Sequence, residues 1–164
     1  MDLLLRAWAK VKNRNRRLVI AGTGPEESSL KKLASDLNLP NVVFTGFLNK
    51  EQQFSLWSNS SALIVPSIWD EPFGMVVLEA WAKERPVVAY AKGALPELIH
   101  HGVSGLLADP FSVEALAKNI QELIDTPDLG PRLGKGGNQR LKDEFNRALW
   151  LSRIGSVYGK VVPA

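Results

Sequence analysis

Short apolar runs rich in β-branched residues alternate along the chain with longer stretches in which apolar residues recur every three or four positions. Apolar runs that end at glycine or proline are typical of buried strands. We predict five strands, over residues 17–21, 42–44, 62–66, 86–90 and 105–108. These runs are apolar on both faces, as in a parallel sheet covered by helices. The strict alternation of strands and helices therefore predicts an α/β fold with a Rossmann-like, doubly wound parallel sheet.

The stretches between the strands predict helices with recognisable ends. The first starts near Pro25, which suits the first position of a helix, and carries apolar side chains at helical spacing over residues 30–37. Asn49 with Gln52 predicts a capping box, and Ser112 predicts the N-cap of a later helix. Further helices are expected over residues 73–84, 96–99 and 112–124. Residues 128–164 are expected to be helical with breaks at Gly134, Gly136 and Gly137.

Ligands of open α/β sheets bind at the carboxyl ends of the strands, where loops lead into helices. Here the loops that follow the first four predicted strands cover residues 22–24, 45–47, 67–74 and 91–95. We therefore expect the functional residues in these loops.

Composition narrows the class of protein. The chain has 164 residues, enough for one domain with a sizeable core, and no apolar run approaches the ~18 residues of a membrane span. The absence of cysteine excludes disulfides, thiolate nucleophiles and Cys-ligated zinc, and it fits a cytoplasmic location. The net charge of +3 weakly favours an anionic ligand.

Basic residues are concentrated near the start of the chain, at Arg6, Lys10, Lys12, Arg14, Arg16 and Arg17. Without aromatic interleaving or a nucleic-acid motif, the cluster is best interpreted as a solvated helix face and the loop after it. We therefore predict no nucleic-acid partner, and peripheral contact with an anionic membrane is the weaker alternative. His100 and His101 are adjacent in a predicted loop and are expected to be surface residues, and no His or Asp cluster predicts a metal site.

The segment from Glu71 to Glu79 is the most informative one. It follows a strand and opens a helix, where Gly74 permits close backbone approach and the first helical amides lack partners. Such amides, together with the helix dipole, can bind a phosphate or a sugar hydroxyl. Glu71 alone could be a dipole partner and Glu79 alone a solvated side chain. Apolar neighbours surround Glu79, so we expect its carboxylate to need a partner.

Six ordered blocks extend over nearly the whole chain, at residues 18–25, 43–47, 65–82, 86–89, 96–99 and 102–107. The third block holds Glu71-Pro72-Phe73-Gly74 and a second carboxylate, Glu79, which is separated from Glu71 by seven residues. These blocks resemble the C-terminal, donor-binding domain of the retaining GT-B glycosyltransferases known as glycosyl transferase group 1. The resemblance implies the C-terminal half of a GT-B fold that binds a nucleotide diphosphate sugar as donor substrate, with no metal or other cofactor.

The resemblance also implies roles for single residues. Glu71 would lie beside the transferring sugar, position its hydroxyls and stabilise the developing oxocarbenium charge, which makes it the catalytic candidate. Glu79 would hold the ribose, because a carboxylate accepts from two vicinal hydroxyls at once. The remaining residues would bind the donor, mostly through their backbone: Gly22, Thr23, Gly24, Gly46, Phe47, Ser67, Phe73, Gly74 and Met75.

Two parts of the family pattern do not match residues of this chain. An Arg and a Lys that clamp the donor diphosphate, and the central strand that carries them, lie upstream of the first helix in the family. The acceptor-binding domain also lies outside residues 1–164, which are expected to form a single, N-terminally truncated nucleotide-sugar-binding domain. We therefore expect the domain to bind a donor but not to complete transfer alone. A non-catalytic nucleotide-sugar-binding module, half of a GT-B nucleotide-sugar epimerase and a flavodoxin-like interaction domain are the alternatives.

Overall fold

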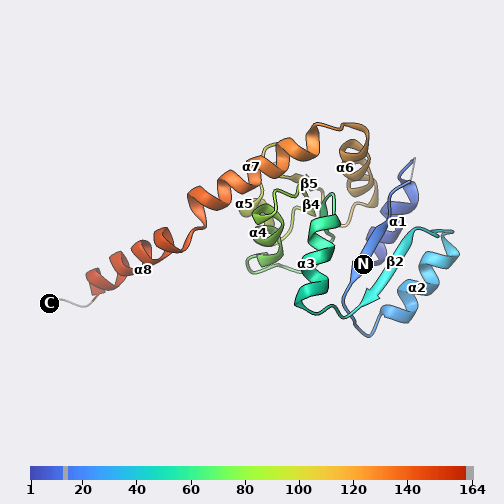
Figure 1. Cartoon of the computed structure of the whole chain (residues 1–164), viewed down its shortest axis with the longest axis horizontal. Coiled ribbons are helices and arrows are strands. Elements are labelled where there is room, and N and C mark those ends of the chain that lie inside the picture. Colours follow the sequence, from blue (N-terminus) through green and yellow to red (C-terminus); the bar gives the residue numbers. More distant parts are fainter. Residues whose placement is uncertain (13–14, 162–164) are drawn as a thin grey trace.

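The computed structural model describes residues 1–12 and 15–161, along which strands and helices alternate (Figure 1). The strands are β1 (Leu18–Ala21), β2 (Val42–Gly46), β3 (Leu63–Val65), β4 (Val87–Tyr90) and β5 (Leu106–Ala108). The helices are α1 (Asp2–Lys10), α2 (Glu27–Asp36), α3 (Lys50–Asn59), α4 (Met75–Ala82), α5 (Leu95–Leu98), α6 (Val113–Asp125), α7 (Leu129–Glu144) and α8 (Arg147–Val161). All five predicted strands are present, each beginning within one residue of its predicted start.

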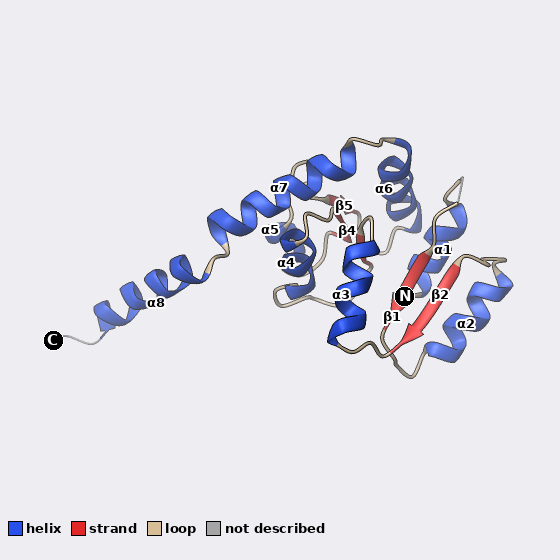
Figure 2. Ribbon diagram, viewed as in Figure 1, coloured by secondary structure: helices blue, strands red, loops and turns tan. Residues whose placement is uncertain are grey.

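The strands form two parallel sheets instead of one continuous sheet (Figure 2). β1 pairs with β2, and the second sheet has the order β3-β4-β5. Within the described residues β1 and β3 are not paired, although Arg16 Nη1 donates a hydrogen bond of 3.1 Å to Ser61 Oγ between the segments that lead into them. The sheet is therefore interrupted between β1 and β3, as the resemblance implied.

Side chains of β4 are buried on both faces of its sheet. Val88 and Tyr90 belong to a core cluster that includes residues of α1, α2 and α6, whereas Val87 and Ala89 belong to a second cluster with residues of α4 and α5. Successive side chains of a strand point to opposite faces, so helices must cover both faces of this sheet. The prediction of a doubly wound α/β fold is thus confirmed.

Helix α1 holds the two sheets together. Its buried residues Leu5 and Trp8 share one core cluster with Ile20 of β1 and Val88 of β4. The indole Nε1 of Trp8 also donates to Asn41 Oδ1 at 3.3 Å, just before β2. An apolar helix face thus bridges the interruption between the sheets.

Two members of the basic cluster, Arg6 and Lys10, lie on α1 and are exposed. Lys12, Arg16 and Arg17 follow the helix and are also exposed, as expected for a solvated helix face and the loop after it; Arg14 lies outside the described residues. Lys10 Nζ lies 3.1 Å from Glu114 Oε1 of α6. The hydrogen bond from Lys10 lowers the pKa of the exposed Glu114 carboxyl. Within the described chain, no helix combines the length and apolar character required to cross a membrane.

Two predicted helix caps are confirmed. Asn49 Oδ1 accepts from Gln52 N at 2.9 Å while Gln52 Oε1 accepts from Asn49 N at 2.9 Å, which completes the capping box of α3. The hydroxyl oxygen of Ser112 accepts from Ala115 N at 3.1 Å at the start of α6.

The prediction of glycine breaks near the end of the chain is wrong. α7 runs without interruption through Gly134, Gly136 and Gly137, and it ends instead at Glu144, before α8 begins at Arg147. A β-carbon at Gly134 would lie 2.0 Å from the carbonyl oxygen of Glu84, and one at Gly137 would lie 2.1 Å from the Trp81 ring. The glycines therefore allow α7 to pack closely against α4 and the segment that follows it.

Candidate functional site

The carboxylate of Glu71 is held by its own loop at the carboxyl end of β3. Ser67 Oγ donates to Glu71 Oε1 at 2.6 Å, and Trp69 Nε1 donates to the same oxygen at 2.9 Å. Glu71 is half-buried, whereas Trp69 remains exposed. The loop thus places a fixed carboxylate at the end of the sheet where α/β proteins bind ligands.

A second loop, between β4 and α5, anchors the Glu71 loop from the side. Lys92 Nζ lies 2.7 Å from Asp70 Oδ1, and Ala94 N donates to the backbone oxygen of Glu71 at 2.9 Å. Gly93 has a left-handed φ of +57°, and a β-carbon there would lie 2.4 Å from Glu71 N. Sequence reasoning gave neither Trp69 nor Gly93 a role; a glycine inside a strand-to-helix loop was the available signal for Gly93.

The amino end of α4 follows the Glu71 loop directly in the sequence. Its N-cap is Gly74, with a left-handed φ of +90°, and a β-carbon at Gly74 would lie 3.0 Å from Leu95 Cδ2. The first amides of a helix have no acceptor within the helix, and the helix dipole adds positive potential there. Phe73 and Met75, on either side of Gly74, are exposed, so an anionic or hydroxyl-bearing group has access to this helix end.

Glu79 lies on the exposed face of α4. Its apolar neighbours Val77, Ala80 and Trp81 turn into the core, while Met75 and Glu79 face solvent. The expectation that the apolar neighbours of Glu79 make a partner necessary is therefore wrong, because Glu79 is exposed. No hydrogen bond or ion pair of the Glu79 side chain is found within the described chain, so both of its oxygens are available to a ligand.

The other predicted donor-binding residues form a separate group at the ends of β1 and β2. Gly22 N donates to Gly46 O at 2.8 Å, and both glycines have left-handed φ values, +111° and +68°. The methyl group of Thr23 lies 4.0 Å from the β-carbon position of Gly46, and Phe47 is 76% exposed. The structure therefore joins Gly22, Thr23, Gly46 and Phe47, with Gly24 exposed beside them, but no described contact links this group to Glu71.

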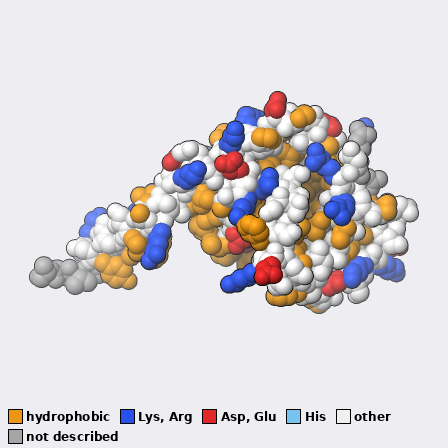
Figure 3. All heavy atoms as spheres, in the orientation of Figure 1, with side chains coloured by type: hydrophobic (Ala, Val, Ile, Leu, Met, Phe, Trp, Pro, Cys, Tyr) orange, Lys and Arg blue, Asp and Glu red, His pale blue; other side chains and the backbone are white. Residues whose placement is uncertain are grey.

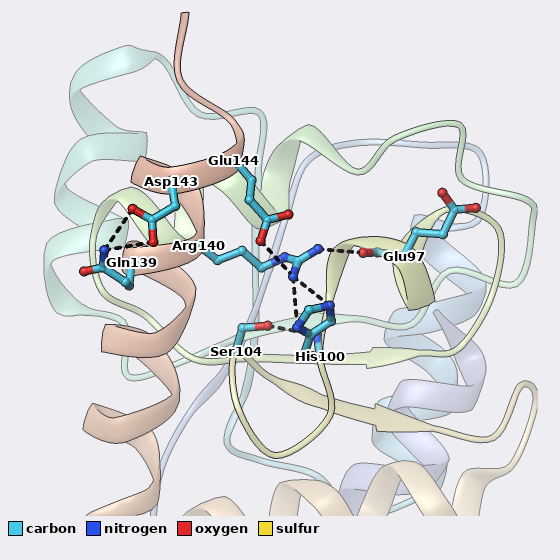
Figure 4. A network of polar contacts seen from close by, with 7 residues as sticks. All are labelled: Glu97, His100, Ser104, Gln139, Arg140, Asp143 and Glu144. Carbon is cyan, nitrogen blue, oxygen red and sulfur yellow. Dashed lines mark hydrogen bonds and ion pairs between the residues drawn. The ribbon is translucent and has the colours of Figure 1, made fainter. Parts of the chain in front are cut away.

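Arg140 of α7 is the centre of a polar network with Glu97, His100 and Glu144 (Figure 4). Its Nη2 donates to the backbone oxygen of Glu97 in α5 at 3.0 Å, and its Nη1 lies 2.6 Å from His100 Nε2 and 3.1 Å from Glu144 Oε1. His100 and His101 are exposed, as predicted. The network thus holds α5, which directly follows the Lys92–Ala94 loop that anchors the Glu71 loop.

Two surface pockets lie along α1 and include none of the predicted site residues. One, of about 340 Å³, is lined by Lys10, Lys12, Ala117, Lys118, Gln121 and Asp125. The other, of about 460 Å³, includes Arg6, Phe111 and Glu114. Their charged groups are solvated, and Lys10 is already paired with Glu114, so we place the candidate site at the loops instead. Among the described residues no group of three His, Asp or Glu side chains is arranged to hold a metal ion.

Relatives of known class match most of the chain. The family model described as Glycosyl transferases group 1 matches residues 1–140. An uncharacterised glycosyltransferase of Methanocaldococcus jannaschii is 34% identical over 92% of this chain and 38% of its own length. Alpha-D-kanosaminyltransferase of Streptomyces kanamyceticus is 32% identical over 98% of this chain and 42% of its own. The chain thus spans about two fifths of the length of these curated relatives.

Solved structures agree with this assignment. Sucrose-phosphate synthase of Thermosynechococcus elongatus superposes with a TM-score of 0.84 at 30% identity, over 98% of this chain and 41% of that one. Anabaena HepE in complex with UDP-glucose superposes with a TM-score of 0.84 at 25% identity, over 96% of this chain and 44% of that one. The C-terminal domain of a group 1 glycosyl transferase (LpcC) of Francisella tularensis, which bears on the fold alone, superposes with a TM-score of 0.79 at 23% identity. The match covers 89% of this chain and 79% of that one. The chain therefore belongs to the glycosyl transferases group 1 family and has the fold of the C-terminal domain of GT-B glycosyltransferases.

Proposed function

We propose that this chain is the donor-binding half of a retaining glycosyltransferase, which transfers a sugar from a nucleotide diphosphate sugar to an acceptor held by a separate domain. The observation that carries the proposal is the Glu71 carboxylate, held by Ser67 and Trp69 beside the amino end of α4. A fixed anion next to unpaired helical amides offers complementary partners for a sugar and its phosphates.

Each part of the site then has a chemical role. Glu71 accepts hydrogen bonds from donor hydroxyls, and its charge stabilises the positive charge that develops on the sugar ring as the bond to the diphosphate breaks. The amides at Phe73, Gly74 and Met75 hold the diphosphate or the sugar. Glu79, exposed one and a half turns or so further along α4, accepts from the two ribose hydroxyls. The glycine loops around Gly22 and Gly46 border the nucleotide.

The relatives support the class of donor. The HepE structure was solved with UDP-glucose, and the Streptomyces kanamyceticus relative is named for the transfer of an aminosugar. Since those proteins are more than twice as long as this chain, the transfer itself and the acceptor domain are part of our proposal. Donor binding is the property to test on these 164 residues.

Thermal unfolding in the presence of ligands tests this directly. The chain is heated with UDP, GDP, ADP, UDP-glucose and GDP-mannose in turn. A ligand that binds only the folded state, present at about one hundred times its Kd, stabilises by about 2.7 kcal/mol, a shift of roughly 5–10 °C for a domain of this size. We expect such a shift with one base and its sugar, and its loss in Glu79→Ala.

Glu122→Ala is the matched control, because Glu122 is also an exposed helical carboxylate but lies on α6. It should leave the shift unchanged. No shift with any of the five ligands, or a shift that Glu79→Ala preserves, contradicts the proposed site.

A further inference from the structure

The two oxygens of the Glu71 carboxylate differ in their surroundings. Oε1 accepts from both Ser67 Oγ and Trp69 Nε1, at 2.6 and 2.9 Å. No hydrogen bond to Oε2 is found among the described residues. A carboxylate oxygen has about two acceptor positions, so Oε1 is saturated and Oε2 is open. The only oxygen that Glu71 can offer a ligand is therefore Oε2, and the two donors decide where it points.

Trp69 combines this fixed polar end with an exposed apolar ring. Its indole is 59% exposed although its one N–H is bonded to Glu71. Because its one N–H is already bonded, this indole has no free hydrogen-bonding group. Burying its apolar ring against apolar surface of a ligand would be favourable. Because its Nε1 is bonded to Glu71 Oε1, the ring lies beside the carboxylate whose Oε2 is open.

The loop that carries these groups is anchored without any ligand. The Lys92–Asp70 ion pair and the bond from Ala94 N to the Glu71 backbone oxygen hold the loop on both sides of the carboxylate. Groups that are in place before binding cost little to order when the ligand arrives. The difference between the two oxygens is thus built into the free protein.

We propose that Ser67 and Trp69 are positioning residues that determine the affinity for the sugar part of the donor by acting through Glu71. The proposal rests on the proposed function, and it assigns the sugar contact to Oε2 of Glu71. The nucleotide part of the donor is bound elsewhere, along α4 and the glycine loops, and is unaffected by these two side chains.

Calorimetric titration separates the two parts of the donor. The chain is titrated with UDP and with UDP-glucose, and with GDP and GDP-mannose; the ratio of the two affinities for one base measures the sugar contribution. In the Ser67→Ala/Trp69→Phe double variant, which keeps an aromatic ring but removes both donors, this contribution should fall by about tenfold while the nucleoside diphosphate affinity stays constant.

Two further variants distinguish positioning from general disruption. Ser67→Thr keeps the hydroxyl and should retain the sugar contribution of the native chain. Trp150→Phe makes the same change as Trp69→Phe at a comparably exposed tryptophan (60%) on α8, and should change neither affinity.

The outcomes are distinguishable. If the native chain binds neither these four ligands nor ADP, the proposed function fails and this inference fails with it. If nucleoside diphosphate binds but the sugar contribution is equal in the native chain and the double variant, the proposed function stands and the assignment of Ser67 and Trp69 is overturned.

Discussion

Gly93 is the residue whose replacement most directly disturbs the Glu71 loop. In Gly93→Ala the new methyl group would lie 2.4 Å from Glu71 N and 2.6 Å from Glu71 O, in a backbone conformation that L residues rarely adopt. Both effects are destabilising, so we expect a loss of roughly 2–4 kcal/mol in unfolding free energy and a loss of nucleotide-sugar binding. Urea unfolding measures the loss of stability, and calorimetric titration measures the loss of binding.

Gly102→Ala is the control for backbone strain alone. Gly102 also has a positive φ, +76°, but no atom lies within 4 Å of its β-carbon position. Gly102→Ala should lower the free energy of unfolding by about 1 kcal/mol and leave nucleotide-sugar binding unchanged. Equal costs at the two positions would show that the contact with Glu71 does not constrain Gly93.

Tyr90 makes the free energy of unfolding decrease at alkaline pH. Burial raises the pKa of its phenol above the ordinary value of 10.0, and the charges of Asp2 and Glu114 raise it further. The folded state therefore holds this proton more tightly than the unfolded state. Its contribution to stability is complete below about pH 10 and declines as the pH rises past that value.

Tyr90→Phe should remove this decline and, at neutral pH, cost about 1 kcal/mol for the lost hydrogen bond to Ser112 O. Unfolding free energies measured from neutral pH to about pH 11 test the difference. Tyr158→Phe, at an exposed tyrosine of α8, should leave the whole curve unchanged. A Tyr90→Phe curve parallel to that of the native chain would contradict the argument.

Sequence reasoning identified Glu71 and Glu79 as candidates from a local motif, but it misjudged the surroundings of Glu79. Apolar neighbours in sequence indicated burial, yet a helix turns those neighbours to one side and leaves Glu79 on the other. The roles of Gly93 and Lys92 depend on contacts with residues about twenty positions away, which no local pattern encodes. Candidate residues were thus predictable where they form a motif, whereas the residues that hold the motif in place were not.

The glycines of α7 show the same limit for a whole element. Glycine normally weakens a helix, which is why the pattern predicted breaks; here the absence of a β-carbon is what lets the helix pack. Strands and helix caps depend on neighbouring residues and were therefore predicted well. The break between β1 and β3 followed only from the family resemblance, because strand order is a property of the tertiary fold.

Two substitutions within α7 test this explanation. Gly134→Ala places a methyl group 2.0 Å from Glu84 O, so it should destabilise by roughly 1–3 kcal/mol despite the higher helix propensity of alanine. Gly130→Ala meets only ordinary contacts at 3.7 Å and should be neutral or slightly stabilising. Chemical denaturation compares the two, and a stabilised Gly134→Ala variant would contradict close packing.

Helix α8 extends away from the rest of the molecule (Figure 3). Its exposed apolar residues include Trp150, Leu151, Ile154, Val157 and Tyr158. These side chains contribute little to the core, so deletion of residues 147–164 should change the unfolding free energy by less than about 1 kcal/mol. It should also reduce self-association at high concentration, because it removes an exposed apolar surface. Denaturant titration and sedimentation measure both; a loss of several kcal/mol would show that α8 supports the fold.

The central claim is that a nucleotide sugar binds at the carboxyl ends of the strands, and amide NMR spectra of the isotope-labelled chain test it most directly. Titration with the nucleotide sugar that stabilises the chain most is predicted to shift the amides of Gly22, Gly24, Gly46, Phe73, Gly74 and Met75. It should leave the lysine-lined pocket between α1 and α6 unchanged. Shifts confined to Lys10, Lys12 and Lys118, where any polyanion would gather, would contradict the account.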